Sequence, residues 1–436
     1  MTNTGTYQLG MRENLGLFTH QLFQVLLVGM TIGLERTVLP VLAEQEFGVA
    51  RGSFTLLFAF VVSFGFVKGA MNFISGRLSE TQGRRRVLVM GWLAALPIPF
   101  MILYAPSWNW IIAANILLGI NQGFAWSMTV TAKMDIIRPT QRGMATGMNE
   151  FAGYTGVALA GLATSYAASF FAPRTSLFIF GLTIILVALA HAWFIFGETL
   201  PFARAEAARH KAAPNTATHQ RFAKGLSDHP TALQVFRLVS YRNRDFMALS
   251  QAGHVEKYID TAMWVLVPVY LHLAGASLIQ IGWITGIYGV VWGASQLWTG
   301  PLSDRVGRKW PAVAGMWISA LGAVLLPQFS TVTGWSFSAA LTGVGMALLY
   351  PTLIAAVSDI SHPNWRGSSL GVYRFWRDLG YGVGALAMGF LVQSTGQITV
   401  GFWFTGGAMA LSGLWLALGL TETHPNIHSN KEGIFQ

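Results

Sequence analysis

The stretch AKMDIIRPTQRG at residues 132–143 recurs as AVSDISHPNWRG at residues 356–367, 224 positions later. Two further pairs of segments keep the same offset: GRLSE at 76–80 with GPLSD at 300–304, and ETLP at 198–201 with ETHP at 422–425. One offset that links three separated places indicates that the chain contains a duplicated half. The repeat therefore predicts two copies of one folding unit, in the same order along the chain.

The composition places these two copies in a membrane. Of the 436 residues, 53% are hydrophobic and 11% are charged, whereas a soluble domain carries about 25% charged residues. This largely excludes a soluble enzyme, a nucleic-acid-binding module and a disordered chain. The chain has no cysteine, which excludes disulfides, thiol nucleophiles and Cys-ligated metal sites.

Twelve stretches have the length and apolar character of a membrane-spanning helix, which needs about 20 residues. They lie at 15–40, 53–75, 87–106, 109–132, 143–167, 175–197, 246–272, 281–301, 311–329, 334–357, 367–392 and 400–420. We therefore expect an N-terminal half of six helices at 1–197, a cytoplasmic linker at 198–245 and a C-terminal half of six helices at 246–436. An even number of spans per half gives the two copies the same orientation, as in parallel-repeat transporters.

The basic residues indicate the orientation of the spans. With the N-terminus inside, 21 of the 28 Lys and Arg residues lie on the inner side and only two lie on the outer side. This asymmetry predicts that both termini are cytoplasmic. It also accounts for the net charge of +10 without a nucleic-acid partner.

The loop of the second copy, GPLSDRVGRK at 300–309, resembles a signature of the major facilitator superfamily, G-x-L-[AS]-D-R-x-G-R-[RK]. The first copy, GRLSETQGRR at 76–85, departs from it, with Glu80 in place of Asp and Thr81 in place of the basic residue. The resemblance covers about residues 15–425. It implies an all-α integral membrane protein with twelve transmembrane helices in two pseudo-symmetric six-helix bundles, which rock around a central cavity.

The loops of the repeat are expected to act as gates. An acid such as Glu80 or Asp304 can face the positive N-terminus of a helix, and the neighbouring bases can pair with acids elsewhere. The residues expected in this role are Gly76, Glu80, Arg84, Gly300, Asp304, Arg305 and Arg308. The alternative is that these arginines only set the topology.

Charged side chains within spans are costly and mark a cavity, a partner or a pathway. The spans hold five acids and five bases, and mutual neutralisation is the simplest interpretation of this balance. The acids are Glu35, Glu150, Glu256, Asp260 and Asp378, and the bases are Arg36, Lys68, Lys257, Arg374 and Arg377.

Helical periodicity groups polar residues into stripes on four spans, and the family resemblance implies that most of these spans line the cavity. The residues expected at the substrate cavity are Glu35, Arg36, Gln122, Trp126, His254, Lys257, Asp260, Arg374 and Arg377. Arg374 has three possible roles: a pair with Asp378, a latch to Glu150, or, with Arg377, an anchor for an anionic substrate.

Proton coupling requires an acid that binds a proton when it is desolvated. The candidates are Glu150, Glu35 and Asp260, and Glu150 ranks first because Arg36 and Lys257 lie beside the other two. A transition-metal site at Met247, His254 and Glu256 is a weaker alternative, and we expect no metal and no cofactor.

The expected function is secondary active transport by alternating access, coupled to protons, of a small polar or anionic organic solute; we expect no enzymatic activity. Two alternatives remain: efflux of drugs or toxic compounds, and a non-transporting receptor or assembly factor. Drug antiporters of the family often have a Gly-Pro pair in the fifth span, and the fifth span of this chain has no proline. We expect a small-molecule substrate, the lipid bilayer and protons as partners, no nucleic acid, a monomer, and a bacterial inner membrane.

Overall fold

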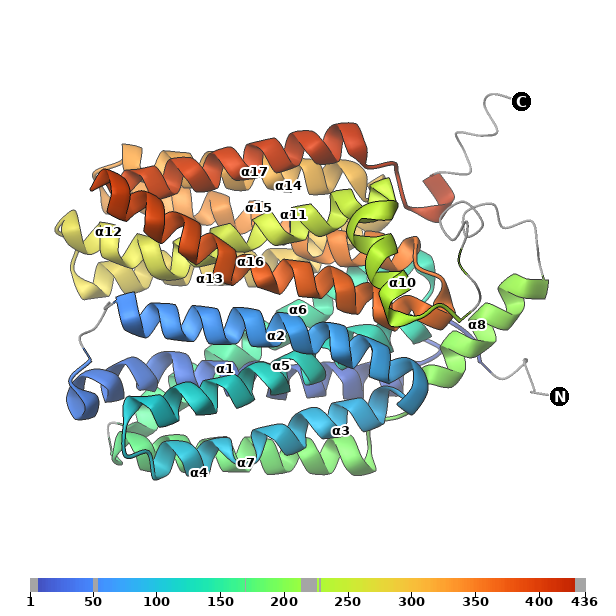
Figure 1. Cartoon of the computed structure of the whole chain (residues 1–436), viewed down its shortest axis with the longest axis horizontal. Coiled ribbons are helices and arrows are strands. Elements are labelled where there is room, and N and C mark those ends of the chain that lie inside the picture. Colours follow the sequence, from blue (N-terminus) through green and yellow to red (C-terminus); the bar gives the residue numbers. More distant parts are fainter. Residues whose placement is uncertain (1–6, 50–53, 169, 213–225, 227–228, 428–436) are drawn as a thin grey trace. The chain divides into compact units, whose positions relative to one another are not determined.

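The structure is a computed structural model that describes residues 7–49, 54–168, 170–212, 226 and 229–427. Side chains at 35–38, 40, 41 and 54–64 lie outside the described set. The secondary structure of the described residues is helical throughout, without strands (Figure 1). In a bilayer only helices and closed barrels satisfy every backbone hydrogen-bond group internally.

The chain divides into two units. Unit 1 contains Met1–Arg138, Asn149–Asn215 and Pro363–Gly371; unit 2 contains Pro139–Met148, Thr216–His362 and Val372–Gln436. Two helices, α6 (Arg142–Ala168) and α16 (Arg366–Thr395), have residues in both units. The predicted boundaries at 197 and 245 remain predictions.

The remaining helices of unit 1 are α1 (Leu15–Phe47), α2 (Phe54–Gln82), α3 (Arg84–Ala95), α4 (Ile98–Leu103), α5 (Trp108–Ile136), α7 (Pro173–Phe194) and α8 (Leu200–Ala212). Unit 2 adds α10 (Ala232–Arg237), α11 (Arg244–Thr261), α12 (Val267–Leu273), α13 (Leu278–Val306), α14 (Lys309–Leu325), α15 (Val332–Asp359) and α17 (Thr399–Gly419). Each of the twelve predicted spans corresponds to one of these helices or to a run of consecutive ones. The all-α, twelve-span fold predicted from the sequence is confirmed.

Two predicted spans contain a break. The span predicted at 87–106 is divided into α3 and α4 around Pro97, which has no amide hydrogen to donate. The span predicted at 246–272 contains a π-helical segment, Ala262–Leu266, directly before α12 and its Pro268. Such π segments are frequent at functional sites.

Eight of the described helices, alone or joined to a short neighbour, are long and apolar enough to cross a membrane by themselves. Helices α11 and α16 are not among them, and each holds four buried charged side chains. The Asn243 side chain caps α11 by accepting hydrogen bonds from the backbone amides of Asp245 and Phe246, both at 3.0 Å. This cap fixes the start of the helix that carries the candidate site.

Candidate functional site

A group of six buried charges lies in unit 2. Helix α11 contributes Glu256, Lys257 and Asp260, and α16 contributes Arg374, Arg377 and Asp378. None of the six side chains is more than 2% exposed. With three acids and three bases, the group has no net formal charge, as a buried ionic cluster requires.

Lys257 is the centre of the group. Its Nζ lies 2.6 Å from Oδ2 of Asp260 and 3.2 Å from Oε1 of Glu256. Two tyrosine hydroxyls also donate to Asp260: Tyr288 to Oδ1 at 2.6 Å and Tyr381 to Oδ2 at 2.9 Å. Asp260 is therefore held by three donors from three helices.

Arg377 has partners that its sequence spacing did not reveal. Its Nη2 lies 3.4 Å from Oε1 of Glu256, and its Nη1 lies 3.4 Å from Oδ1 of Asp378. The guanidinium also stacks on Tyr350, with Cζ 3.7 Å from the ring centroid. Glu256 thus connects Arg377 to Lys257.

Aromatic rings surround the ammonium group of Lys257. The Nζ atom is 5.4 Å from the ring centroid of Trp292, 5.1 Å from that of Tyr350 and 5.1 Å from that of Tyr381. Such distances allow cation–π attraction. The sequence analysis missed Tyr350, because it lies on α15, where no charged residue in the span drew attention to it.

Unit 1 contains a second buried network around Glu150. Its Oε1 accepts hydrogen bonds from Nε1 of Trp126 at 2.9 Å and from Nδ2 of Asn149 at 2.8 Å. The Asn149 Oδ1 accepts from Nζ of Lys133 at 2.8 Å. Oε2 of Glu150 is buried without a hydrogen-bond partner among the described residues. The side chain of Asn149 thus connects Glu150 to a base, Lys133. This connection was not predicted from the sequence.

The other predicted cavity residues are dispersed. Gln122 joins α5 to α1 by donating to the Val28 carbonyl at 3.1 Å and to Oγ1 of Thr31 at 3.0 Å. His254 Nδ1 lies 2.8 Å from the Trp376 carbonyl oxygen. The side chains of Glu35 and Arg36 lie outside the described residues. Glu150 belongs to unit 1 and Arg374 to unit 2, so the latch between them stays a prediction.

The predicted gating acid of the second copy lies at a helix N-terminus. Asp304 accepts hydrogen bonds from the amides of Gly143 at 2.8 Å and Met144 at 2.7 Å, in the first turn of α6. Arg308 Nη1 lies 2.7 Å from the same carboxylate. Gly300 is required here, because a Cβ at this position would lie 2.4 Å from the Gly143 carbonyl oxygen.

The first copy repeats this arrangement with Glu80. Its Oε1 accepts from the Ser368 amide at 2.7 Å, in the first turn of α16, and its Oε2 pairs with Arg77 at 2.8 Å. Glu80 lies beyond the predicted span, and burial raises its pKa although these donors act in the opposite direction. A Cβ at Gly76 would lie 2.4 Å from the Gly367 carbonyl oxygen. Arg305 is exposed, and the gating role of the whole set stays a prediction.

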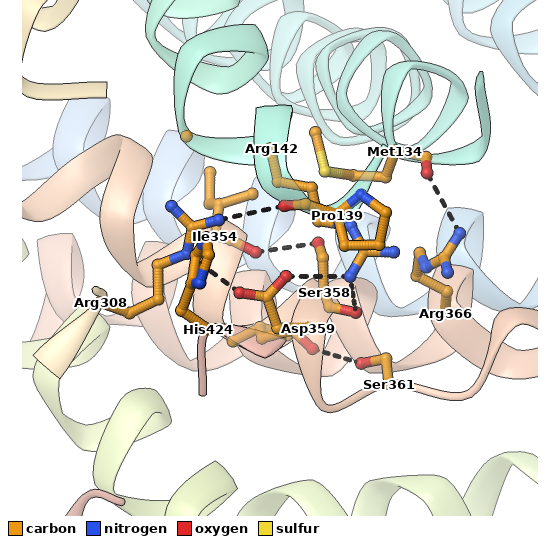
Figure 2. Close-up of polar contacts among 12 residues, drawn as sticks. Met134, Pro139, Arg142, Arg308, Ile354, Ser358, Asp359, Ser361, Arg366 and His424 are labelled. Carbon is orange, nitrogen blue, oxygen red and sulfur yellow. Dashed lines mark hydrogen bonds and ion pairs between the residues drawn. The ribbon is translucent and has the colours of Figure 1, made fainter. Parts of the chain in front are cut away.

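The other repeated segments supply partners for these arginines. Arg308 Nε lies 2.9 Å from Oδ2 of Asp359, and Arg142 Nη1 lies 2.9 Å from Oδ1 of the same residue (Figure 2). In unit 1, Arg84 pairs with Asp135 at 2.8 Å. Glu198 and Glu422 accept from the backbone amides of Arg84 and Arg308 at 2.9 and 2.8 Å.

Arg366 breaks the symmetry. It donates to the Met134 carbonyl at 3.1 Å (Figure 2) and makes a two-point contact with Glu206 of α8, at 2.9 and 2.8 Å. Its distance to Asp135 is 3.7 Å.

The sequence analysis missed most of these partners: Asp135, Arg142, Glu198, Asp359, Arg366 and Glu422. The repeat could have indicated them, because these six residues form three pairs of identical residues at the 224-residue offset. Glu206 has no counterpart in this pattern, since residue 430 is Asn. No group of three or more His, Asp and Glu side chains suited to a metal occurs among the described residues.

Comparison with known proteins agrees with the twelve-span fold and the repeated loops. Residues 22–248 and 258–434 match the family described as the Major Facilitator Superfamily. The chain belongs to this family. Members of the major facilitator superfamily are membrane transporters, not enzymes, so the chain is an integral membrane transporter for small molecules.

Relatives within the superfamily differ in what they carry. An uncharacterized MFS-type transporter of Salmonella typhimurium is 24% identical over 388 residues, or 84% of this chain and 87% of the relative. The 3-(3-hydroxy-phenyl)propionate transporter of Escherichia coli is 32% identical over 134 residues, or 29% of this chain and 31% of the relative. Multidrug resistance protein 2 of Bacillus subtilis is 29% identical over 125 residues, or 28% of this chain and 30% of the relative.

A solved structure has the same fold. The human organic anion transporter TETRAN superposes with a TM-score of 0.73, at 17% identity, over 92% of this chain and 99% of that chain. At this identity the similarity establishes the major facilitator fold alone.

Proposed function

We propose that the chain is a secondary active transporter that moves a small organic anion together with a proton by alternating access. The observation that carries the proposal is the ionic cluster of unit 2. Lys257 and Arg377 are buried beside aromatic rings, and Arg374 is buried on the same helix as Arg377. Arginine and lysine are the residues that bind carboxylate and phosphate groups.

The charge balance of this cluster favours coupling to a proton. Its three acids and three bases cancel, so a bound monoanion would leave one uncompensated negative charge in a buried site. An uncompensated buried charge is strongly unfavourable. Protonation of one acid restores neutrality and would make the loaded transporter equivalent in charge to the empty one.

Two described acids are candidates for the proton, Glu150 in unit 1 and Asp260 in unit 2. Both are fully buried. Glu150 has an oxygen without a hydrogen-bond partner among the described residues, and Asp260 is held by Lys257 and two tyrosines. Glu35, the third predicted candidate, lies outside the described side chains.

The relative from Escherichia coli supports an anionic substrate, because its name specifies a hydroxyphenyl propionate. The basic excess on one side of the spans supports cytoplasmic termini. The bacterial relatives and the compact loops support placement in an inner membrane.

The test is a proton-flux assay with purified protein in liposomes that enclose a pH-sensitive dye. Pools of organic anions, zwitterions and cationic drugs are added outside, and Glu150→Gln and Asp260→Asn are run beside the parent. Glu46→Gln, a partly exposed acid that pairs with Arg174, is the matched control. We expect an anion pool to move protons into the liposomes, with loss of the signal in one of the two buried-acid variants. If none of the pools causes proton flux, the proposal is contradicted and the receptor or assembly-factor alternative is favoured.

Drug efflux is the second candidate. Buried acids beside aromatic rings can hold a cation, and one relative is named a multidrug resistance protein. In the same assay, a response to cationic drugs alone would favour efflux over anion transport.

A further inference from the structure

Lys257 has two acidic partners that are not equivalent. Glu256 lies at 3.2 Å and also accepts from Arg377, whereas Asp260 lies at 2.6 Å and also accepts from two tyrosines. If Asp260 gained a proton, Tyr288 and Tyr381 would still hold its carboxyl group in place. Lys257 would keep Glu256 as one partner and would have a position free for another anion.

We propose that Asp260 is the proton carrier and that the substrate carboxylate replaces it as the partner of Lys257. The proton binds the Asp260 carboxylate, the Lys257–Asp260 ion pair opens, and an ion pair between Lys257 and the substrate forms. No covalent bond to carbon changes, and the cluster gains one positive and one negative charge. The inference rests on the proposed function and adds the proton-binding residue, the anion-binding residue and a stoichiometry of one to one.

The surroundings of Lys257 restrict the substrate. The rings of Trp292, Tyr350 and Tyr381 lie about the ammonium group, so a carboxylate bound there has its carbon skeleton against aromatic faces. Aromatic pairs gain about 0.5–1.5 kcal/mol beyond the area that they bury. A dicarboxylate would bring a second charge that one proton does not balance. The geometry points to a monocarboxylate with an aromatic or flat apolar group.

Other ionisable groups belong to the buried cluster around Lys257 and Asp260. Lys257 and Glu256 lie on the same helix, and Tyr288 approaches from α13 and Tyr350 from α15. Helix α16 contributes four groups: Arg374, Arg377, Asp378 and Tyr381. Arg377 lies near enough to act on Asp260 electrostatically.

The test measures binding of radiolabelled 3-phenylpropionate to the full chain in detergent between pH 5 and 8, with proton uptake recorded by an indicator dye in weak buffer. For the parent we expect one proton taken up per anion bound, and an affinity that falls about tenfold per pH unit above the midpoint of the transition. Asp260→Asn, which imitates the protonated acid, should bind at all pH values without proton uptake. Lys257→Gln should lose at least about 100-fold in affinity at every pH, a larger loss than for one ordinary hydrogen bond.

If Asp260→Asn does not fold, Tyr288→Phe tests the same assignment. Removal of a hydrogen bond to the charged carboxylate favours its protonated form, so binding should extend to higher pH. Tyr270→Phe, on α12, is the matched control, because its hydroxyl donates to the Pro327 carbonyl at 3.4 Å and not to Asp260; its profile should equal that of the parent.

The outcomes separate this inference from the proposed function. If the parent carries cationic drugs and neither binds nor carries anions, the proposed function itself is wrong. If the parent carries anions with protons while Asp260→Asn keeps the parental pH profile, only the assignment to Asp260 is wrong. If Glu150→Gln alone loses proton uptake, the assignment to Asp260 is also wrong, and the proton-binding residue is Glu150.

Discussion

The Nη1 atom of Arg142 lies 2.9 Å from Oδ1 of Asp359, in a buried ion pair between residues 217 positions apart. Their counterparts in the repeat are Arg366 and Asp135, and these lie 3.7 Å apart. The difference has a local cause, because Glu206 of α8 binds Arg366 at two points. Glu206 of α8 therefore changes one of two otherwise similar contacts of the repeat.

Glu206→Gln should destabilise the protein. The substitution leaves the fully buried Arg366 without its charged two-point partner, and loss of one member of a buried pair costs about 3–5 kcal/mol. We expect a midpoint of thermal unfolding in detergent several degrees below that of the parent. Glu13→Gln, at a solvent-exposed pair with Arg138, is the control and should shift the unfolding midpoint little. Equal shifts for both variants would contradict a special role for Glu206.

Gly300→Ala should impair transport by separating α13 from the first turn of α6. The new Cβ would lie 2.4 Å from the Gly143 carbonyl oxygen, and neither backbone can yield without moving a helix. We expect a loss of at least about tenfold in transport rate, the factor that corresponds to about 1.4 kcal/mol in a barrier. Gly286→Ala on the same helix meets no atom within 4 Å and should transport like the parent.

Asp304→Asn should loosen the contact with α6. The neutral amide keeps one acceptor oxygen but loses the charge that favours the helix N-terminus and holds Arg308. Because the chain has no cysteine, a single Ser361→Cys reporter in this buried region can be labelled with a water-soluble maleimide. We expect labelling several times faster in Asp304→Asn than in the parent reporter. Unchanged labelling would show that Asp304 does not hold the region closed.

His424 should make stability fall in mild acid. Its ring is buried beside Arg308, without a hydrogen-bond partner among the described residues. Burial, and then the charge of Arg308, lower its pKa below the ordinary 6.5, although nearby acids oppose this. The unfolded chain therefore binds a proton more readily than the folded chain. The stabilisation is complete above pH 6.5 and is lost as the pH falls from there towards the pKa of the folded state.

The check is thermal unfolding of the parent and of His424→Leu at pH 7.5 and 5.5. Leucine is the residue at the equivalent position of the first copy, Leu200, so it should fit. We expect the drop in unfolding temperature between the two pH values to be smaller in the variant. A drop of the same size in both proteins would exclude His424 as its cause.

The sequence by itself determined the twelve spans, the repeat and the family. Span length and apolar composition are local properties, and a bilayer allows only helices for such segments. The 224-residue offset also contained the arginines and acids of these repeated ion pairs, although not which of them pair. Lys257 and Asp260, one turn apart on a single helix, could be placed together for the same local reason.

Only the tertiary structure decided which distant side chains meet. Tyr288, Tyr350 and Arg377 come from three helices, and no spacing along the chain brings them to Asp260, Lys257 and Glu256, respectively. The contact of Glu206 with Arg366 is of the same kind, since it interrupts a symmetry that the repeat itself would suggest. Helix packing fixes such contacts, because a side chain's neighbours across a bundle depend on how helices are rotated and offset, which local sequence periodicity does not specify.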